Sequence, residues 1–466
     1  MPGPKARGRC CATVARTPSI CRRGGSPQAK SSGAPSPRRC DRARSRARSR
    51  PLGFVAMSSI AHRLARVAAG DGVAAVSAHG VHEHDIAAGA ALLRAAGGVV
   101  LDAEGREIAF SGEDRARVSG CIAGAPEAAR ALARIRWAEV VAAPKGEPRV
   151  RIGFPRVADE ARLARAQACV LGQAIGDSLG SLVEFQDARA IAKAYPQGVR
   201  DLADGGTWGT IAGQPTDDTE LALALARAIL RAGRYDAEAA LAAYRAWLAS
   251  RPFDLGATTR AALAGRPDPE SQANGSLMRV SPIGVWAAGD PARAAEAARA
   301  DSRLTHPNPV CVEACAGFAA AIAAGIASGD REAMLVAALA HSSGAAREAI
   351  ERGAAGDSPR DFLSQQGRVL IALQNAFRQL RHAADFESAI VATVAEGGDT
   401  DTNAAIAGAL AGAFWGRDAI PGRWVLPVLA CRSCEEAGAR RPRPMDYWPD
   451  DVLEVAEGLL QVGGRG

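Results

Sequence analysis

The stretch "GGDTDTNAAIAGALAGAFWG", residues 397–416, sets two aspartates and two threonines directly before a small, apolar run with helical spacing. A second stretch, "GQPTDDTELALALARAIL" (213–230), repeats this arrangement. One residue is enough to cap a helix, and one acid in the first turn already interacts favourably with the helix dipole. Adjacent carboxylates repel each other unless a cation lies between them, so the doubled acids indicate more than capping.

The two acidic helix starts therefore predict one shared site. Carboxylate and hydroxyl oxygens without histidine or cysteine are ligands that favour Mg²⁺ or Mn²⁺ over zinc. Helix capping alone is the competing explanation of both stretches.

From residue 159 onward the sequence is typical of an all-α domain. Ala/Leu-rich stretches with helical periodicity alternate with Gly/Pro/Asp loops, and strand candidates are few. Small residues such as Gly172, Gly176 and Gly180 fit close contact between helices. We predict a compact helical domain over 159–466, with helices at 161–172, 220–232, 237–250, 291–300, 311–327, 331–341, 362–380, 386–396, 403–414 and 450–460.

The first fifty residues have a different character. They hold fourteen Lys or Arg against the single acid Asp41, a balance of +13 within a net charge of +7, so the other residues sum to −6. With almost no aliphatic content, residues 1–50 are expected to be a disordered basic tail. Three interpretations of it stay open: a nucleic-acid-binding arm, a targeting segment, or mistranslated upstream sequence. The mildly acidic remainder does not resemble a nucleic-acid binder.

Residues 51–140 read as a short α/β segment, and 141–158 as a linker. The most apolar run, 310–328, contains Glu313 and is interpreted as a packed helix rather than a membrane span. Ten cysteines show neither a disulfide framework nor a complete zinc spacing, which is typical of a reducing cytoplasm. We take a monomer as the default.

Five motifs carry a resemblance between residues 171 and 416. They are, in order, "LGQAIGDSLGSLVEF", "GTIAGQPTDDTELALALA", "ANGSLMRVSPIG", "LTHPNP" and "GGDTDTNAAIAGALAGAFWG". Together they resemble the ADP-ribosylglycohydrolase family. The resemblance implies an all-α domain with two Mg²⁺ or Mn²⁺ ions. It also implies cleavage of an N- or O-glycosidic bond at ribose C1″ of an ADP-ribosylated protein or of a small ADP-ribose derivative.

Matching the motifs residue by residue gives the expected site. Catalysis falls on Glu184, Asp217 and Asp218. The metal ligands implied by the resemblance are Thr216, Asp217, Asp218, Asp399, Asp401 and Thr402. The substrate contacts that it implies are Asn274, Gly275, Ser276, Leu277, Met278 and His306. Arg279 fits either a phosphate contact or a buried ion pair, and Ser271-Gln272-Ala273 departs from the glycine that many members have.

The segment from about Pro51 to Trp137 resembles the C-terminal portion of the inositol monophosphatase family. A metal-binding aspartate of that family falls on Asp85, with His84 in place of a tryptophan. The family's other metal motifs are not found upstream, so this segment is expected to be inactive. Two alternatives to an active hydrolase stay open: a catalytically silent ADP-ribose-binding protein, and a remnant of a phosphatase–glycohydrolase fusion.

Overall fold

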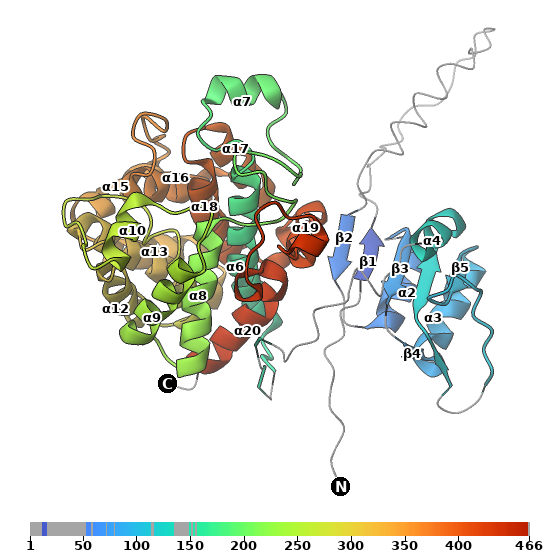
Figure 1. Cartoon of the computed structure of the whole chain (residues 1–466). Coiled ribbons are helices and arrows are strands. Elements are labelled where there is room, and N and C mark those ends of the chain that lie inside the picture. The colour runs from blue at the N-terminus through green and yellow to red at the C-terminus, as the bar shows by residue number, and fades with distance from the viewer. Residues whose placement is uncertain are drawn as a thin grey trace, which may run out of the picture. The chain divides into compact units, whose positions relative to one another are not determined.

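The computed structural model describes residues 12–15, 53–56, 59–70, 72–78, 80–112, 116–134, 149–150, 152–153 and 156–464 (Figure 1). The chain divides into two compact units, Met1–Gly146 and Glu147–Gly466. Of the predicted linker, residues 141–148 lie outside the described residues.

The first unit is built on an antiparallel sheet. Each neighbouring pair of strands runs antiparallel, in the order β2-β1-β3-β7-β5. Two further short strands, β4 and β6, pair with each other in a separate antiparallel sheet. The strands are β1 (Ala12–Ala15), β2 (Gly53–Ala56), β3 (Ala74–Ser77), β4 (Val81–His82), β5 (Val99–Leu101), β6 (Arg117–Val118) and β7 (Cys121–Gly124).

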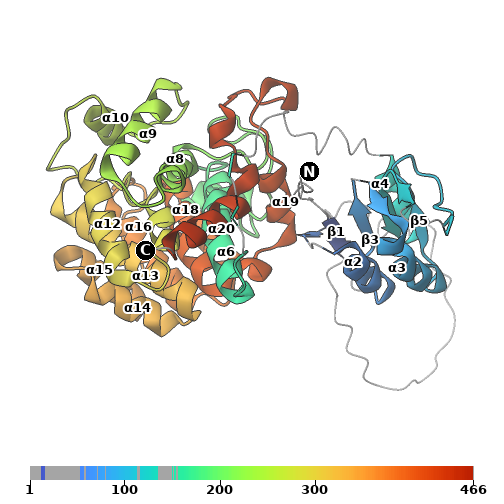
Figure 2. The same cartoon turned by 90° about the horizontal axis from the view of Figure 1, so that it is seen from below.

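Helices cover both faces of this sheet (Figures 1 and 2). Because side chains alternate along a strand, Ala123 packs with Leu64 of α2 (Ile60–Ala68) and with α3 (Glu83–Ala95). Its neighbour Ile122 packs with Leu132 of α4 (Pro126–Ala133) on the opposite face. The α/β character predicted for this segment is therefore confirmed.

Strand β1 corrects one expectation. Residues 1–50 are predicted to be disordered throughout, yet Ala12–Ala15 pairs with both β2 and β3. These four residues, "ATVA", are uncharged and include two β-branched side chains, which favour a strand inside a basic segment. The rest of 1–50 lies outside the described residues.

The second unit is all-α, as predicted. Its first eight helices are α6 (Glu160–Gly180), α7 (Ala188–Ala194), α8 (Asp217–Ala232), α9 (Ala237–Ala249), α10 (Ala257–Leu263), α11 (Ser281–Trp286), α12 (Pro291–Arg303) and α13 (Pro309–Ser328). The others are α14 (Arg331–Ala340), α15 (Gly344–Ala355), α16 (Val369–His382), α17 (Phe386–Ala395), α18 (Thr400–Trp415), α19 (Gly422–Ala430) and α20 (Val452–Gly463), with short 3₁₀ turns at 417–419, 435–437, 445–447 and 449–451.

Helices α6 and α18 lie side by side at the centre of this unit (Figures 1 and 2). Their backbones touch: a Cβ added at Gly176 would lie 2.0 Å from the carbonyl oxygen of Ala404, and one at Gly408 would lie 2.1 Å from that of Gly172. The facing residues step by four in opposite directions along the two helices, so the helices run antiparallel. Only glycine permits this approach.

Two predicted helix boundaries are wrong by more than three residues. The helix expected at 161–172 continues to Gly180, because its glycines face α18 and the packing outweighs their low helix propensity. The helix expected at 362–380 begins only at Val369. Asp361 and Gly367 both have positive φ, +64° and +78°, which the α-helix does not allow.

Helix α13 is long and apolar enough to cross a membrane by length and composition alone. However, 78% of its most apolar window is buried inside the structure, against α12, α14, α15 and α18 among others. This agrees with the expectation of a packed core helix.

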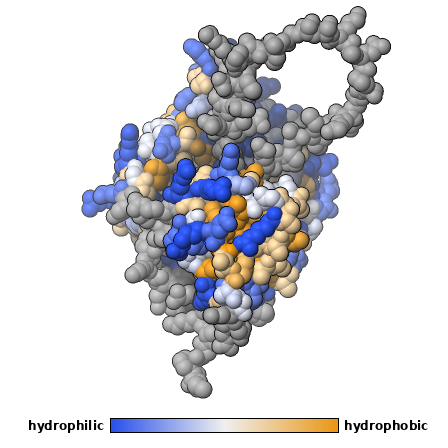
Figure 3. Space-filling model, turned by 90° about the vertical axis from the view of Figure 1, so that its right-hand side faces the viewer, coloured by the Kyte–Doolittle hydropathy of each residue, from blue (hydrophilic) through white to orange (hydrophobic). Residues whose placement is uncertain are grey.

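Figure 3 shows one face of the molecule, on which an apolar area is bordered by hydrophilic side chains. Among the described residues, large exposed hydrophobic side chains such as Leu92 and Val336 stand on separate elements. Scattered apolar side chains of this kind are ordinary on protein surfaces.

The contact between α6 and α18 generates a prediction. Gly176→Ala should lower the free energy of unfolding by at least about 2 kcal/mol, because the two backbones must separate to admit one methyl group. Urea titration followed by tryptophan fluorescence measures this, since six of the seven tryptophans lie in the helical unit.

A matched control is Gly256→Ala. An added Cβ at Gly256 would meet only Thr259 Oγ1, at 3.9 Å, and φ there is −58°. Because Gly256 is the N-cap residue of α10, where alanine is less favoured than glycine, we expect a loss of no more than about 1 kcal/mol. Equal losses in both variants would contradict the close contact.

Candidate active site

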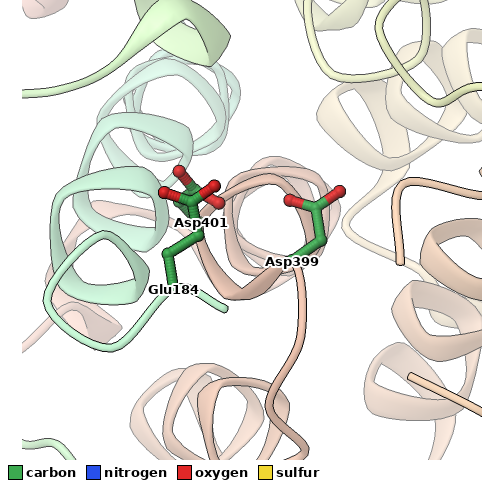
Figure 4. A group of neighbouring side chains, drawn as sticks. All are labelled: Glu184, Asp399 and Asp401. Carbon is green, nitrogen blue, oxygen red and sulfur yellow. The ribbon is translucent and has the colours of Figure 1, made fainter. Parts of the chain in front are cut away.

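The two helices meet at one end in a cluster of carboxylates. Glu184 lies in the turn after α6, while Asp399 and Asp401 lie at the start of α18 (Figure 4). Backbone hydrogen bonds hold the two segments together: Phe185 N–H donates to Gly398 O at 2.7 Å, and Gly398 N–H donates to Gln186 O at 2.9 Å. The close packing of the helices therefore sets the distance between their acidic ends.

One oxygen from each of Glu184, Asp399 and Asp401 lies within 4.8 Å of the others, and all three residues are buried. Burial, together with Asp254 and Asp399, raises the pKa of Glu184 to about 8. Burial and the charges of Glu184 and Asp218 raise the pKa of Asp401 well above its usual range. A cation that neutralises these buried carboxylates would stabilise their ionised form.

The start of α8 supplies the second half of the cluster. Thr216, Asp217 and Asp218 are all buried there. Burial raises the pKa of both aspartates far above the usual value, with further contributions from neighbouring carboxylates that include Asp399 and Glu184. The two acidic helix starts therefore face a common space, as the sequence predicts.

Capping does not explain these acids. Asp177, on α6, accepts hydrogen bonds from the backbone N–H groups of Thr216 (2.9 Å) and Thr219 (3.0 Å), and from their hydroxyls at 2.9 and 2.6 Å. The start of α8 is thus capped from another helix. Thr216, the residue in the N-cap position, makes no side-chain cap hydrogen bond, and neither does Asp399 on α18. In the described part of the chain, Asp401 alone of the four aspartates accepts a backbone N–H of its own helix start, from Thr402 at 2.9 Å, so capping leaves most of these acids unexplained.

The oxygens present fit a hard divalent cation. Asp218 Oδ1 is buried without a hydrogen-bond partner among the described residues, although a buried carboxylate oxygen normally has one. The surrounding side chains are carboxylates and hydroxyls, the ligands that Mg²⁺ and Mn²⁺ prefer. Glu184, Asp399 and Asp401 could hold one ion by position alone. Thr402, 6% exposed, lies next to Asp401 in the first turn of α18.

Two residues at the site are not predicted from the sequence. Trp208 Nε1–H donates to Glu184 Oε2 at 2.7 Å. Asp254, between α9 and α10, has its pKa raised to about 7 by burial and by the charges of Asp177 and Asp399. Nothing in "RPFDLG" marks Asp254, because it is a single acid in a loop without a second acid or a helix start beside it.

The predicted substrate loop, 274–278, borders the cluster. Asn274 Nδ2–H donates to Asp399 Oδ2 at 2.7 Å. The backbone N–H groups of Gly275 and Ser276 donate to no acceptor in the described part of the chain. Leu277 and Met278 are buried in the core, at 0% and 5% exposed. Of this loop, the Asn274 side chain contacts the cluster, and two neighbouring N–H groups have no described acceptor.

Arg279 is a buried ion pair rather than an exposed phosphate contact. Its Nε–H donates to Asp301 Oδ2 at 3.0 Å, both side chains are 0% exposed, and the guanidinium lies 4.2 Å from the ring centre of Tyr244. His306 is also fully buried. Burial and the nearby Arg279 lower the pKa of His306 to about 3, and its Nε2 lies beside Gly275 with no hydrogen-bond partner among the residues that the structure describes.

Asp85 belongs to the first unit. It lies in the first turn of α3, with His84 Nε2 3.3 Å from its Oδ1 and 37% of its side chain exposed. Among the described residues the one carboxylate group close enough to share an ion is Glu184, Asp399 and Asp401. Asp85 has His84 beside it but belongs to no described group of three side chains that could hold a metal.

Comparisons with known proteins cover both units. Residues 158–461 match the family described as ADP-ribosylglycohydrolase, and residues 15–140 match the inositol monophosphatase family. The second match begins at residue 15 rather than at about Pro51 as the motifs suggest. The Arg/Ser/Pro-rich composition after β1 hides this earlier start in the sequence.

Individual relatives agree with the first match. The chain is 32% identical over 275 residues to ADP-ribosyl-[dinitrogen reductase] glycohydrolase of Rhodospirillum rubrum, covering 56% of this chain and 89% of that protein. It is 29% identical over 309 residues to ADP-ribosylarginine hydrolase Tri1 of Pseudomonas putida strain GB-1, covering 62% and 81%.

A solved structure described as an ADP-ribosylglycohydrolase-related protein complex aligns with 65% of this chain and 99% of its own. Its TM-score is 0.53 and its sequence identity is 29%. The sequence match, the relatives and the fold agree: this chain belongs to the ADP-ribosylglycohydrolase family.

Proposed function

We propose that the chain is a metal-dependent hydrolase that releases ADP-ribose from ADP-ribosylated protein, with arginine as the first linkage to test. The observation that carries this is the burial of Glu184 with two acidic helix starts, at neither of which the N-cap residue makes a side-chain cap hydrogen bond. Two relatives, an ADP-ribosyl-[dinitrogen reductase] glycohydrolase and an ADP-ribosylarginine hydrolase, support this choice of substrate. We expect the reaction to take place in the cytoplasm.

We further propose that two Mg²⁺ or Mn²⁺ ions belong to the site. Bound there, they would orient the ribose hydroxyls and lower the pKa of an attacking water. The residues that would hold them are Thr216, Asp217, Asp218, Asp399, Asp401 and Thr402.

The protein's own groups manage the proton. Hydrolysis adds the hydroxyl of water to C1″ and its proton to the departing nitrogen or oxygen. Glu184 is suited to accept the water proton and to return it, because burial keeps its pKa near neutrality, at about 8. Trp208 N–H donates to one oxygen of Glu184, and the Glu184 carboxylate lies beside that of Asp401 (Figure 4).

The substrate loop is suited to an anion. The free N–H groups of Gly275 and Ser276 lie next to Asn274, whose side chain is held by Asp399. Successive N–H groups of this kind bind phosphate oxygens. We assign them to the diphosphate of ADP-ribose, which would set the distal ribose beside Glu184.

Loss of a carboxylate generates the central prediction. With Mg²⁺ or Mn²⁺ present, the wild-type protein should release ADP-ribose from an arginine-ADP-ribosylated protein, and a chelator should abolish release. Asp217→Asn and Glu184→Gln should each lower kcat by about 100-fold or more, through loss of a metal ligand and of the general base. Release is measured by chromatography.

The control is Asp418→Asn, whose side chain is 91% exposed and lies outside the cluster. It should keep wild-type activity. Binding of ADP-ribose without any release would favour the catalytically silent alternative. If the protein neither binds nor releases ADP-ribose, that result contradicts the proposed function.

A pH dependence of stability follows from the raised pKa values. Asp177, Asp254 and Glu184 titrate near 6, 7 and 8 in the folded protein, above the usual values of 3.8 and 4.5. At pH values between the usual pKa and the folded-state pKa of each group, the folded state binds more protons than the unfolded state. Without metal, the free energy of unfolding is therefore highest at low pH and falls as pH rises.

We therefore expect the urea midpoint of chelator-treated protein to fall from about pH 5 to about pH 8. Saturating Mn²⁺ should flatten this slope, because a cation replaces the bound protons. The Asp418→Asn protein should behave like wild type. The same slope with and without Mn²⁺ would argue against a cation at the cluster.

A phosphatase activity of the first unit is not favoured. Asp85 is partly exposed and belongs to no described group of three side chains that could hold a metal. We propose that the region similar to inositol monophosphatases is inactive as a phosphatase, which agrees with a fusion remnant.

A further inference from the structure

Three aromatic side chains from three loops border the carboxylate cluster. Phe185 follows Glu184, Trp208 lies in the loop before α8, and Phe253 precedes Asp254. The Phe185 and Trp208 ring centres are 6.4 Å apart and those of Trp208 and Phe253 are 5.9 Å apart, with the rings inclined at 75° and 54°. We call Phe185, Trp208 and Phe253 the aromatic rim.

The conformation of Phe185 has a cost. Its φ is +66°, in the left-handed region that bulky residues avoid, and its side chain is 50% exposed. The hydrogen bond from Phe185 N–H to Gly398 O, at 2.7 Å, holds this conformation. Strain that the surrounding structure enforces is concentrated at functional sites. An exposed aromatic ring held this way indicates a ligand.

The rim lies next to the reacting centre. Trp208 Nε1 is 2.7 Å from the Glu184 carboxylate, so its ring is in direct contact with the proposed base. In ADP-ribose a diphosphate and a second ribose separate adenine from C1″, whereas the leaving group is bonded to C1″ itself. A ring this close to Glu184 therefore faces the leaving group and not adenine.

The chemistry of the rim favours a planar cation. Aromatic faces attract cations, and a guanidinium also stacks on them because it is flat and weakly hydrated. Two carboxylates flank the rings, Glu184 beside Trp208 and Asp254 after Phe253. The hydroxyl of serine offers neither charge nor a flat surface to such a site.

We propose that the aromatic rim, flanked by Glu184 and Asp254, receives the guanidinium of the leaving arginine and selects arginine-linked ADP-ribose over serine-linked ADP-ribose. This rests on the proposed function. It assigns Phe185 and Phe253 a role in specificity and leaves the bond-breaking step to the carboxylate cluster.

Kinetics of Phe185→Leu and Phe253→Leu test the rim. Leucine keeps apolar bulk and removes the aromatic face. KM for an arginine-ADP-ribosylated peptide should rise about threefold to thirtyfold, the range of one to two cation–π contacts, while kcat changes less. Phe185→Tyr, which retains the ring, should stay within about twofold of wild type. Val336→Ala, a change at a 60% exposed residue on α14, is the control.

A second measurement separates the leaving group from adenine. The Kd for ADP-ribose, which lacks the leaving group, should be the same in wild type and in both leucine variants. A weaker Kd for ADP-ribose would assign the rim to the nucleotide and overturn the proposal. A KM for the arginine-linked peptide that is unchanged in both leucine variants would also overturn it.

A third measurement needs no turnover. Agmatine, a small guanidinium compound, should bind wild type more tightly than Phe185→Leu by about threefold or more in a calorimetric titration. If wild type releases no ADP-ribose but shows this difference, the proposed function fails and the guanidinium site stands. Equal agmatine binding would overturn the site itself.

Discussion

The backbone contact between α6 and α18 is the constraint on which the helical unit depends. Glycines on both helices let carbonyl oxygens of one come within 2.5 Å of where a Cβ on the other would lie. No larger residue could occupy these positions without separating the helices. The two chain segments that carry Glu184 and Asp399 are thereby held at a fixed separation.

This close packing supports an arrangement that is unfavourable by itself. Buried carboxylates repel one another, and their raised pKa values measure that repulsion together with the loss of water. Asp177 adds to the support because it joins α6 to the start of α8 through hydrogen bonds with Thr216 and Thr219. Three helices thus keep like charges together, and a site of this kind stores the energy that a cation recovers on binding.

The sequence predicts the class of fold and the two acidic helix starts. Both follow from local patterns: helical periodicity, and doubled acids where a single cap would serve. It does not predict that α6 runs through Gly172, because the gain comes from α18, more than two hundred residues away. Asp254 and Trp208 are missed for the same reason, since their roles depend on loops that meet only in the folded chain. Strand β1 is hidden by the charged residues around it.

The capping of α8 by Asp177 has a consequence for ion size. Helix starts that are fixed to their neighbours by hydrogen bonds and by touching backbones cannot move apart to enlarge their coordination sphere. Ca²⁺ takes six to eight oxygens at about 2.3–2.6 Å, whereas Mg²⁺ takes six at about 2.0–2.1 Å. If the proposed ions bind here, helix starts this rigid would accommodate the smaller coordination sphere of Mg²⁺ more readily than that of Ca²⁺.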